Sequence, residues 1–373
     1  MICFLRCAPV SEDIRLRKYT EACRSRDVSF FAITWDRMKR SVKEDYEIQF
    51  QMLAPYGNRY KNAWSRIIWQ FFVFVNLLKN KKKYSIIHVT NFENILPALL
   101  TKFFCRKKVV YDIYDSSSVD ISNKILLMFM RNLDRFCIRK SDILILPAKE
   151  RLIQMSIDRS DYKIFLEVEN VPNIKDIAIP ENNLNINNIK LSYVGDFDYN
   201  RGLEELLEFV NNNSRITLDI AGRGSLKKIV EEYSTKNTRI VYYGQVPYEK
   251  GLEIMKKSDF VLGMYYTKNG TLTNHIYASP NKYCESLYLA KPLITTCETL
   301  VGDRVKNGNT GYVIGESVKD LQILFDKYNK SNPEIVKEYD EIINNAAELW
   351  NQKYVNYFEK VLKTDYIDLV NKI

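Results

Sequence analysis

Histidine is scarce in this sequence, and its cysteines lack the spacing of zinc ligands. It has two histidines, and none of its seven cysteines forms a CxxC pair. The cysteines are odd in number and scattered along the chain. We therefore expect neither a disulfide framework nor a structural zinc site, and we predict buried thiols in a reducing compartment.

The sequence also lacks a long hydrophobic run. Its longest apolar stretch, 64–78, is interrupted by Ser65, Arg66, Gln70 and Asn76, so it is too short and too polar to span a bilayer. The first residues do not follow the order of a secretory signal peptide, which is a basic start, then an apolar run, then a small-residue cleavage site. We therefore expect a cytoplasmic protein. A composition of 46% hydrophobic and 27% charged residues excludes a disordered or low-complexity chain.

Length and charge indicate that the chain has two parts. At about 150 residues per domain, 373 residues suggest two or three domains. Residues 1–172 carry 30 Lys and Arg against 19 Asp and Glu, a net charge of +11, whereas residues 173–373 carry 25 against 27, a net charge of −2. This asymmetry predicts an anionic partner for the first half.

Short apolar runs alternate with longer helical patterns throughout the chain. The expected strands are 2–8, 28–34, 84–89, 108–113 and 142–147, then 189–195, 216–222, 238–244, 259–265 and 292–296. The expected helices are 14–25, 62–80, 93–105, 121–140 and 148–158, then 202–212, 226–235, 247–257, 280–290, 317–329, 333–349 and 352–371. Such alternation predicts an α/β protein with parallel sheets built from βαβ units.

An Asn- and Pro-rich segment divides the pattern into two Rossmann-like domains, which we expect to face each other across a cleft. The predicted organisation is an N-terminal domain at 1–172, a linker at 173–188 and a C-terminal domain at 189–349. We expect the last segment, 350–373, to be a helix that packs back towards the N-terminal domain.

The junction SPNKYCE is the richest candidate site, because ligands of parallel α/β sheets bind where strands lead into helix N-termini. Ser279 suits an N-cap and Pro280 a first helical position, so the helix start would favour an anion. Lys282 adds a positive charge. Asn281 and Glu285 share one helix face, and a carboxylate there suits the hydroxyls of a ribose. An ordinary capped helix with surface charges is the alternative.

A second junction, VGDFDYNRGLEELL, places Arg201 at the start of another helix, which Asn200 can cap. Arg suits bidentate binding of a phosphate, although a solvated loop Arg is the alternative. Asp196 and Asp198 form a DxD pattern that turn chemistry explains more simply than a metal site. The IAGRG turn is too incomplete a fingerprint to indicate NAD.

The strand ends of the first half supply acceptor-side candidates. Asp13 and Arg15 lie after the first strand, and a charge cluster at a helix start is the alternative for both. His88 ends a strand, and we favour a structural role for it over a catalytic one. Tyr114 and Asp115 follow the strand at 108–113.

Eight segments, taken in chain order, carry a resemblance to a known family: EDIRLRKYTEACRSRDVSFFAITWDR, YSIIHVTNFENILPALL, VVYDIYD, LEVENVPN, VGDFDYNRGLEELL, IAGRG, YYGQV and SPNKYCESLYLAKPLI. Together they resemble the retaining sugar-nucleotide glycosyltransferases of the GT-B fold, specifically glycosyltransferase family 4 (group 1). The resemblance implies a hexosyltransferase that needs no metal or other cofactor. It also implies a UDP-sugar or GDP-sugar donor, a glycan or lipid-linked acceptor, and no nucleic-acid partner.

The resemblance also implies the roles of particular residues. Arg201 and Lys282 would bind the donor diphosphate, and Glu285 the nucleotide ribose. The other implied donor-binding residues are Gly195, Gln245, Val246, His275, Tyr277, Ser279, Pro280 and Asn281. Three positions depart from the family pattern: Tyr277 stands for a first glutamate, Asp196 for a second basic residue, and Tyr114 for a histidine. A catalytically silent partner subunit or glycan-binding scaffold is therefore the alternative function.

Basic residues gather around the helix expected at 62–80. Lys79, Lys81, Lys82 and Lys83 lie at its end, which predicts peripheral binding to an anionic membrane surface, with a solvated helix end as the alternative. The same helix carries apolar side chains at helical spacing, for which we favour a core face over membrane insertion. These are Trp64, Ile67, Ile68, Phe71, Phe72 and Phe74.

Overall fold

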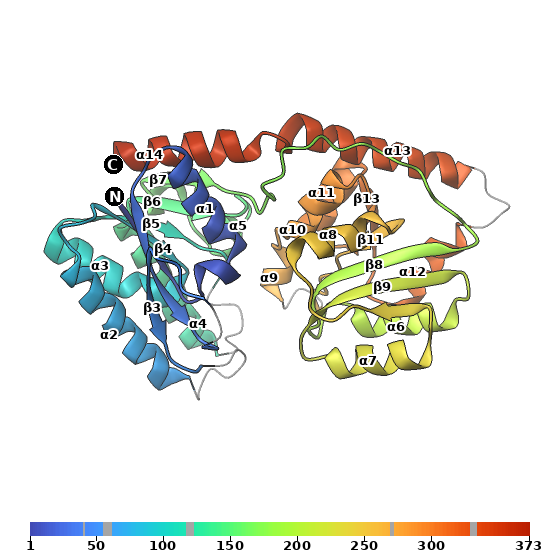
Figure 1. Ribbon diagram of the computed structural model, residues 1–373, viewed down its shortest axis with the longest axis horizontal. Helices are drawn as coiled ribbons and strands as arrows, with labels where there is room; N and C mark the ends of the chain where they lie inside the picture. The colour runs from blue at the N-terminus through green and yellow to red at the C-terminus, as the bar shows by residue number, and fades with distance from the viewer. Residues whose placement is uncertain (40–41, 55–61, 117–122, 269–271, 329–333) are drawn as a thin grey trace. The chain divides into compact units, whose positions relative to one another are not determined.

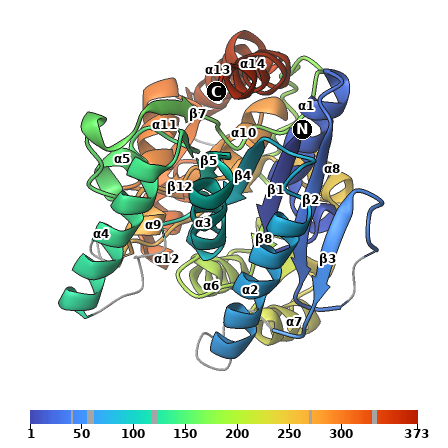
Figure 2. The same ribbon diagram turned by 90° about the vertical axis from the view of Figure 1, so that its left-hand side faces the viewer.

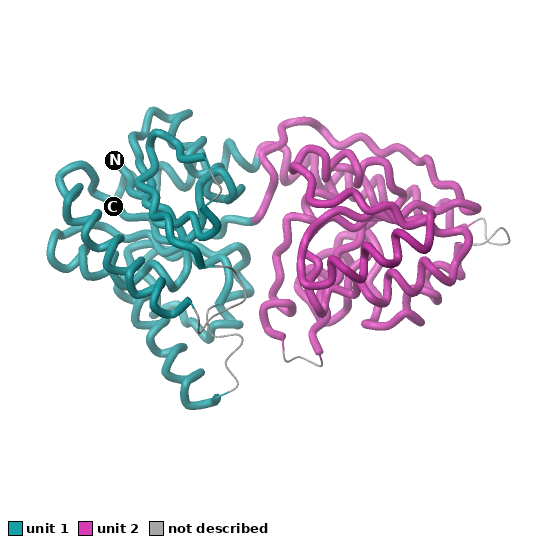
Figure 3. Tube along the Cα trace, turned by 60° about the horizontal axis from the view of Figure 1, so that its bottom comes forward, with its two compact units in different colours: residues 1–169, 357–373 teal, residues 170–356 magenta. Residues whose placement is uncertain are grey.

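The computed structural model describes residues 1–373 except 40–41, 55–61, 117–122, 269–271 and 329–333. It divides into two compact units (Figure 3). Unit 1 comprises residues 1–169 and 357–373, and unit 2 comprises residues 170–356. The chain thus leaves unit 1 three residues before the expected end of the first domain, and it returns after residue 356 rather than after 349.

Unit 1 contains a seven-stranded sheet in the order β3-β2-β1-β4-β5-β6-β7, with every neighbouring pair parallel. Its strands are β1 (Ile2–Arg6), β2 (Phe30–Asp36), β3 (Glu47–Gln51), β4 (Ile86–Thr90), β5 (Lys108–Asp112), β6 (Ile143–Leu146) and β7 (Ile164–Glu167). The central strands β1, β4, β5 and β6 are almost wholly buried, as their continuous apolar sequences require.

Helices cover both faces of this sheet (Figure 1). On one face lie α2 (Ala63–Lys79), α3 (Ile95–Cys105) and α4 (Lys124–Lys140), and on the other α1 (Ile14–Ser25) and the C-terminal segment. The helix expected at 148–158 is reduced to one turn, α5 (Arg151–Gln154). The alternating side chains of the strands separate into two hydrophobic clusters, one under each helical layer.

The end of the chain is helical but not purely α-helical. Two α-helices, α13 (Glu334–Leu349) and α14 (Ile367–Lys372), flank π-helical turns at η4 (Trp350–Tyr354) and η5 (Phe358–Tyr366). Phe358, Leu362 and Tyr366 are buried in the same cluster as α1, which fixes residues 357–373 on unit 1.

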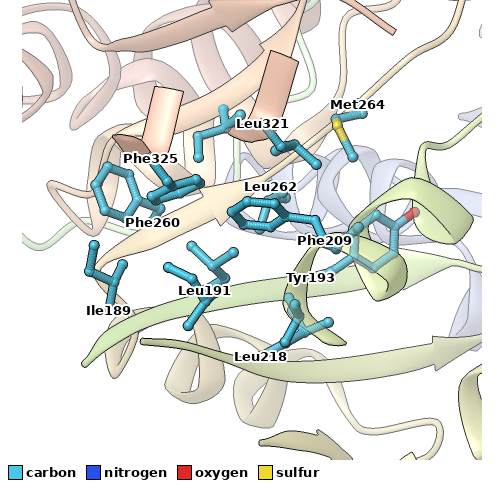
Figure 4. Close-up of a cluster of buried hydrophobic side chains, with 14 of the residues drawn as sticks. Ile189, Leu191, Tyr193, Phe209, Leu218, Phe260, Leu262, Met264, Leu321 and Phe325 are labelled. Atoms are coloured by element: carbon cyan, nitrogen blue, oxygen red, sulfur yellow. The ribbon is translucent and has the colours of Figure 1, made fainter. Parts of the chain in front are cut away.

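Unit 2 contains a six-stranded parallel sheet in the order β10-β9-β8-β11-β12-β13. Its strands are β8 (Ile189–Asp196), β9 (Ile216–Arg223), β10 (Ile240–Tyr242), β11 (Phe260–Leu262), β12 (Leu293–Thr296) and β13 (Gly311–Ile314). Its other helices are α6 (Leu203–Asn212), α7 (Lys227–Lys236), α8 (Tyr248–Lys256), α9 (Thr273–Ile276), α10 (Asn281–Tyr288), α11 (Leu300–Gly308) and α12 (Val318–Asp326). Phe260 of β11 packs against Phe325 of α12, and Phe325 stacks on Phe209 of α6 (Figure 4).

Three strands, β3, β7 and β13, were not expected from the sequence. All three lie at sheet edges, and most of their residues are only partly buried. An edge strand faces solvent along one side, so it need not carry the continuous apolar run that marks the buried strands. The helix α11 was also not expected.

Candidate functional site

Arg201 lies in the loop between β8 and α6, at the carboxyl edge of the unit 2 sheet. Gly202 is the N-cap of α6 with φ 65°, and a Cβ atom at this position would lie 2.5 Å from the Met264 side chain. The expectation that Asn200 caps this helix is wrong. Asn200 instead accepts a hydrogen bond through its carbonyl from the Tyr266 amide at 3.0 Å, which ties the loop to the segment after β11.

The Arg201 guanidinium is held against an aromatic ring. Its central carbon lies 4.6 Å from the centre of the Tyr265 ring. Burial raises the pKa of the Tyr265 hydroxyl to about 12, and the neighbouring Arg201 charge partly offsets this rise. The guanidinium is partly buried and already held in place. Binding a phosphate would therefore cost it little further conformational freedom.

Lys282 lies in the first turn of α10 and reaches back over the end of β8. Its Nζ donates a hydrogen bond to the Val194 carbonyl and lies 5.4 Å from the centre of the Tyr193 ring. Removal from water lowers the pKa of Lys282, Glu285 raises it, and the positive charge of Arg201 lowers it further. The structure thus brings the two predicted basic residues to one place beside Gly195.

The start of α10 differs from the expectation. Ser279 is not the N-cap, and Pro280 is not the first helical residue: the helix begins at Asn281, and Pro280 occupies the N-cap with an extended backbone. Ser279 is instead buried, where its carbonyl accepts a hydrogen bond from Asn170 at 2.8 Å and its hydroxyl lies 3.4 Å from Nη1 of Arg304. Because proline has no side-chain acceptor, the N-cap residue supplies no side-chain bond to the first amides of α10.

Glu285 lies one turn further along α10 and is only 6% exposed. Tyr248, the first residue of α8, is hydrogen bonded to its carboxylate, and burial followed by the Glu285 charge raises the pKa of the Tyr248 hydroxyl. The hydroxyl therefore stays protonated and donates to Glu285. This bond joins Glu285 to the turn that carries Gln245 and Val246, which precedes α8. Nothing in the sequence distinguished Tyr248 from the other 24 tyrosines as a partner of Glu285.

The remaining donor-side candidates have varied surroundings. The Nδ1 atom of His275 lies 2.8 Å from the Tyr266 carbonyl, and the ring meets Tyr265 edge-on at 5.9 Å between centres. Tyr277 follows α9 and is partly buried, whereas Asn281 is exposed. His275 thus packs against the same tyrosine that holds Arg201.

The aspartates of the DxD pattern lie in the turn after β8. Asp196 ends the strand, and Asp198 is exposed, with Oδ1 3.4 Å from the Ser225 hydroxyl. A Cβ atom on Gly222 would lie 1.8 Å from the Gly195 carbonyl oxygen, so only glycine allows β9 to approach this turn. Among the described residues, no three His, Cys, Asp or Glu side chains gather in a group that could hold a metal ion.

In unit 1, the predicted acceptor-side residues Asp13 and Arg15 have partners within the protein. Both side chains are buried and already paired. Asp13 caps α1 by accepting from the Leu16 amide and forms an ion pair with Arg6. Arg15 donates from Nη2 to Asp112 at 2.9 Å and also bonds the Val168 carbonyl. These residues hold α1 against the sheet.

His88 is likewise buried, in line with the structural role favoured from the sequence. The ring is 0% exposed and packs against Phe4 and Tyr19. Its Nδ1 atom lies 2.8 Å from the Tyr366 hydroxyl, and its Nε2 atom lies 3.5 Å from Oδ2 of Asp112. Burial lowers the pKa of His88, which favours the neutral ring.

Tyr114 and Asp115 remain as acceptor-side candidates at the carboxyl edge of the unit 1 sheet. The guanidinium carbons of Arg6 and Arg15 lie 4.6 and 4.9 Å from the centre of the Tyr114 ring. Asp115 is exposed and accepts from Nη2 of Arg151 at 3.3 Å. Arg151 was not among the candidates that the sequence indicated. Its Nε and Nη1 atoms and the Tyr114 hydroxyl are buried without a hydrogen-bond partner among the described residues.

We expect Asp112→Asn to destabilise the protein by about 3–5 kcal/mol, because it leaves the Arg15 charge buried without its partner. Burial alone would raise the pKa of Asp112, but Arg15 and His88 together lower it. The stabilisation by this carboxylate is therefore fully present above the ordinary carboxyl pKa and is lost as the pH falls through the lower folded value. Urea unfolding measures the loss, and Asp365→Asn at an exposed site is the control. Equal stability of the two variants would contradict the prediction.

Comparison with known proteins agrees with this architecture. Sucrose-phosphate synthase from Thermosynechococcus elongatus superposes with a TM-score of 0.70 at 12% identity, covering 100% of this chain and 97% of that one. HepE of Anabaena, solved in complex with UDP, gives a TM-score of 0.68 at 13% identity and covers all of both chains. The chain therefore has the GT-B fold, which confirms the predicted fold class.

The sequence comparisons agree with the resemblance. Residues 175–349 match the model of the glycosyl transferases group 1 family. The chain is also 23% identical to the uncharacterized glycosyltransferase MJ1069 of Methanocaldococcus jannaschii over 279 residues, which are 64% of this chain and 68% of that protein. The predicted resemblance is confirmed.

Proposed function

We propose that the protein is a retaining glycosyltransferase that moves a hexose from a UDP-sugar or GDP-sugar to a hydroxyl group of a growing surface glycan. The observation that carries the proposal is the meeting of Arg201, Lys282 and Glu285 around the end of β8 and the start of α10. This arrangement pairs two positive charges for a diphosphate with one buried carboxylate for a ribose.

Each residue has a separate task in this proposal. Glu285 accepts hydrogen bonds from the ribose hydroxyls, and Tyr248 keeps its carboxylate oriented. Arg201, Lys282 and the amides at the start of α10 bind the diphosphate. They stabilise the negative charge that develops on it as the bond to the sugar breaks. Gln245 and Val246 border the base, and His275 and Tyr277 lie on the sugar side.

The transfer itself needs no protein base in this proposal. The bond between the anomeric carbon and the phosphate oxygen breaks, and a bond from the acceptor oxygen forms on the same face of the sugar. The acceptor proton passes to the leaving phosphate. No metal or other cofactor takes part, because the side chains and helix terminus supply the positive charge.

The acceptor side of the proposal uses Tyr114 and Asp115, with Arg151 added by the structure. The unpaired donors of Arg151 and Tyr114 suit oxygen acceptors on a glycan or on its lipid-linked phosphate. We place the enzyme in the cytoplasm at the inner face of a membrane, where an anionic leaflet attracts exposed Lys79, Lys81, Lys82 and Lys83.

Thermal unfolding with UDP, GDP or NAD tests the donor class. Binding to the folded state alone raises the melting temperature, so stabilisation by one nucleoside diphosphate supports the transferase. A panel of sugar nucleotides then identifies the donor by its slow hydrolysis, which needs no acceptor. Absence of stabilisation by both UDP and GDP would favour a catalytically silent partner subunit.

We further expect the product to keep the anomeric configuration of the donor and the activity to survive EDTA. Retention follows from attack on the same face of the sugar, and EDTA resistance follows from charge stabilisation by Arg201 and Lys282. The anomeric proton coupling of the product measures the first, and turnover after chelation measures the second. Inversion, or dependence on manganese, would contradict the mechanism and restore Asp196 and Asp198 as metal ligands.

A further inference from the structure

The three helices on one face of unit 1 expose many large apolar side chains. Figure 2 shows α2, α3 and α4 side by side, and α3 contacts both of its neighbours. We call their exposed apolar side chains the outer apolar surface. Its members are Trp64, Ile67, Phe71, Leu96, Leu100, Phe103, Phe104, Ile125, Leu126, Met128, Phe129 and Phe136.

Packing within unit 1 does not explain this surface. The helix α2 buries Trp69, Val73 and Leu77 against the sheet, as a core face requires. Trp64, Ile67 and Phe71 follow the i, i+3, i+7 spacing of a second stripe that points away from the sheet, and Trp64 is 68% exposed. The expectation that these three residues belong to the core is therefore wrong. Exposed apolar patches of this kind mark sites of interaction.

The charges on the three helices are almost entirely of one sign. The only acidic residue of α2, α3 and α4 is Asp134, which is buried and bonded to the Tyr111 hydroxyl. Their basic residues are Arg66, Lys79, Lys102, Lys124, Arg131, Arg135, Arg139 and Lys140. Exposed Lys81, Lys82 and Lys83 follow α2 directly.

We propose that the outer apolar surface inserts into the interface of an anionic lipid bilayer, while the basic residues around it bind the lipid headgroups. Aromatic and aliphatic side chains on one face with Lys and Arg at its border are the pattern of interfacial helices. A second copy of the chain fits less well. A symmetric dimer through this face would bring the same basic residues against each other.

This inference rests on the membrane location in the proposed function and makes it more specific. The side chains that carry it belong to unit 1 and play no part in the proposed donor site. None of the helices in the described part of the chain is long and apolar enough to cross a membrane. The proposed mode is therefore shallow, with three helices lying along the surface.

Trp64 provides a reporter already present in the protein. Of the four tryptophans, Trp35, Trp69 and Trp350 are almost wholly buried, so a change of environment on binding is confined to Trp64. Addition of phosphatidylglycerol vesicles should shift the emission to shorter wavelength, and brominated lipid should quench it. Trp64→Phe should abolish both changes while the protein still sediments with the vesicles.

A second variant separates insertion from charge attraction. Phe71→Ser, Phe103→Ser and Phe129→Ser together should weaken vesicle binding by roughly a hundredfold or more, because each phenylalanine leaving water contributes on the order of tenfold. The matched control, Ile323→Ser with Val336→Ser on exposed positions of α12 and α13, should bind normally. Replacing Lys79, Lys81, Lys82 and Lys83 by Gln should weaken the salt-sensitive part of the binding and leave the change in Trp64 emission on binding.

The results that would contradict insertion into the bilayer can be told apart. Sedimentation with unchanged Trp64 emission would mean attraction by charge alone and would overturn insertion, as would equal binding of the triple variant and wild type. A concentration-dependent dimer that the triple variant abolishes would assign the surface to a second copy. Donor hydrolysis without vesicles reports on the proposed function separately, and the triple variant should leave it unchanged.

Discussion

Glu285→Ala is expected to slow donor turnover by roughly thirtyfold to a thousandfold. The substitution leaves ribose hydroxyls without their charged acceptor, at a cost of about 2–4 kcal/mol in transition-state binding. It also removes the partner of the buried Tyr248 hydroxyl. Hydrolysis of the sugar nucleotide measures the effect without an acceptor, and circular dichroism checks that the variant is folded.

Two further variants make this result specific. Glu208→Ala removes an exposed carboxylate of α6 in the same unit, and it should leave hydrolysis unchanged. Tyr248→Phe keeps the ring and removes only the hydroxyl that orients Glu285, so its loss should be smaller than that of Glu285→Ala. A fully active Glu285→Ala enzyme would remove Glu285 from the site.

The order of strands and helices was largely predictable, because both sheets are parallel and their central strands are buried on two faces. Such strands have continuous apolar sequences, for example ILIL in β6. The edge strand β3, EIQFQ, alternates with polar residues and gave no such signal. The three strands that were missed lie at sheet edges, where partial burial leaves the sequence ambiguous.

The proximity of the candidate donor-site residues was predictable from the sequence, but their contacts were not. The sequence indicated that Arg201 and Lys282 act together, since both follow strand ends of one sheet. It did not indicate that Pro280 would replace Ser279 at the N-cap, because that depends on the bonds of Ser279 to Asn170 and Arg304. These partners are distant in sequence.

The acceptor side shows the same limit more strongly. Asp13, Arg15 and His88 have residue types suited to chemistry, but the fold buries all three. Their partners, Arg6, Asp112 and Tyr366, come from three separate segments. Helical periodicity likewise identified α2 but not which of its two apolar stripes faces the sheet.

Lys282→Ala is expected to lower donor hydrolysis by about 10²–10³-fold, the usual effect of removing one group that stabilises developing negative charge. Lys282→Arg keeps the positive charge, and it should retain part of the activity. The control Lys306→Ala removes an exposed lysine near the end of α11 and should have no effect. Wild-type activity in Lys282→Ala would contradict the assignment to the diphosphate.

The pH dependence supplies a test that a merely structural lysine would not pass. Removal from water lowers the pKa of Lys282 from the ordinary 10.5, so its charge is lost at a lower pH than that of a solvated lysine. As the pH rises through this lowered value, kcat/KM for donor hydrolysis should fall, because kcat/KM reports on the free enzyme. In Lys282→Arg the guanidinium keeps its charge to above pH ~12, so the same alkaline decline should move to higher pH. An alkaline decline at the same pH in both enzymes would assign it to another group.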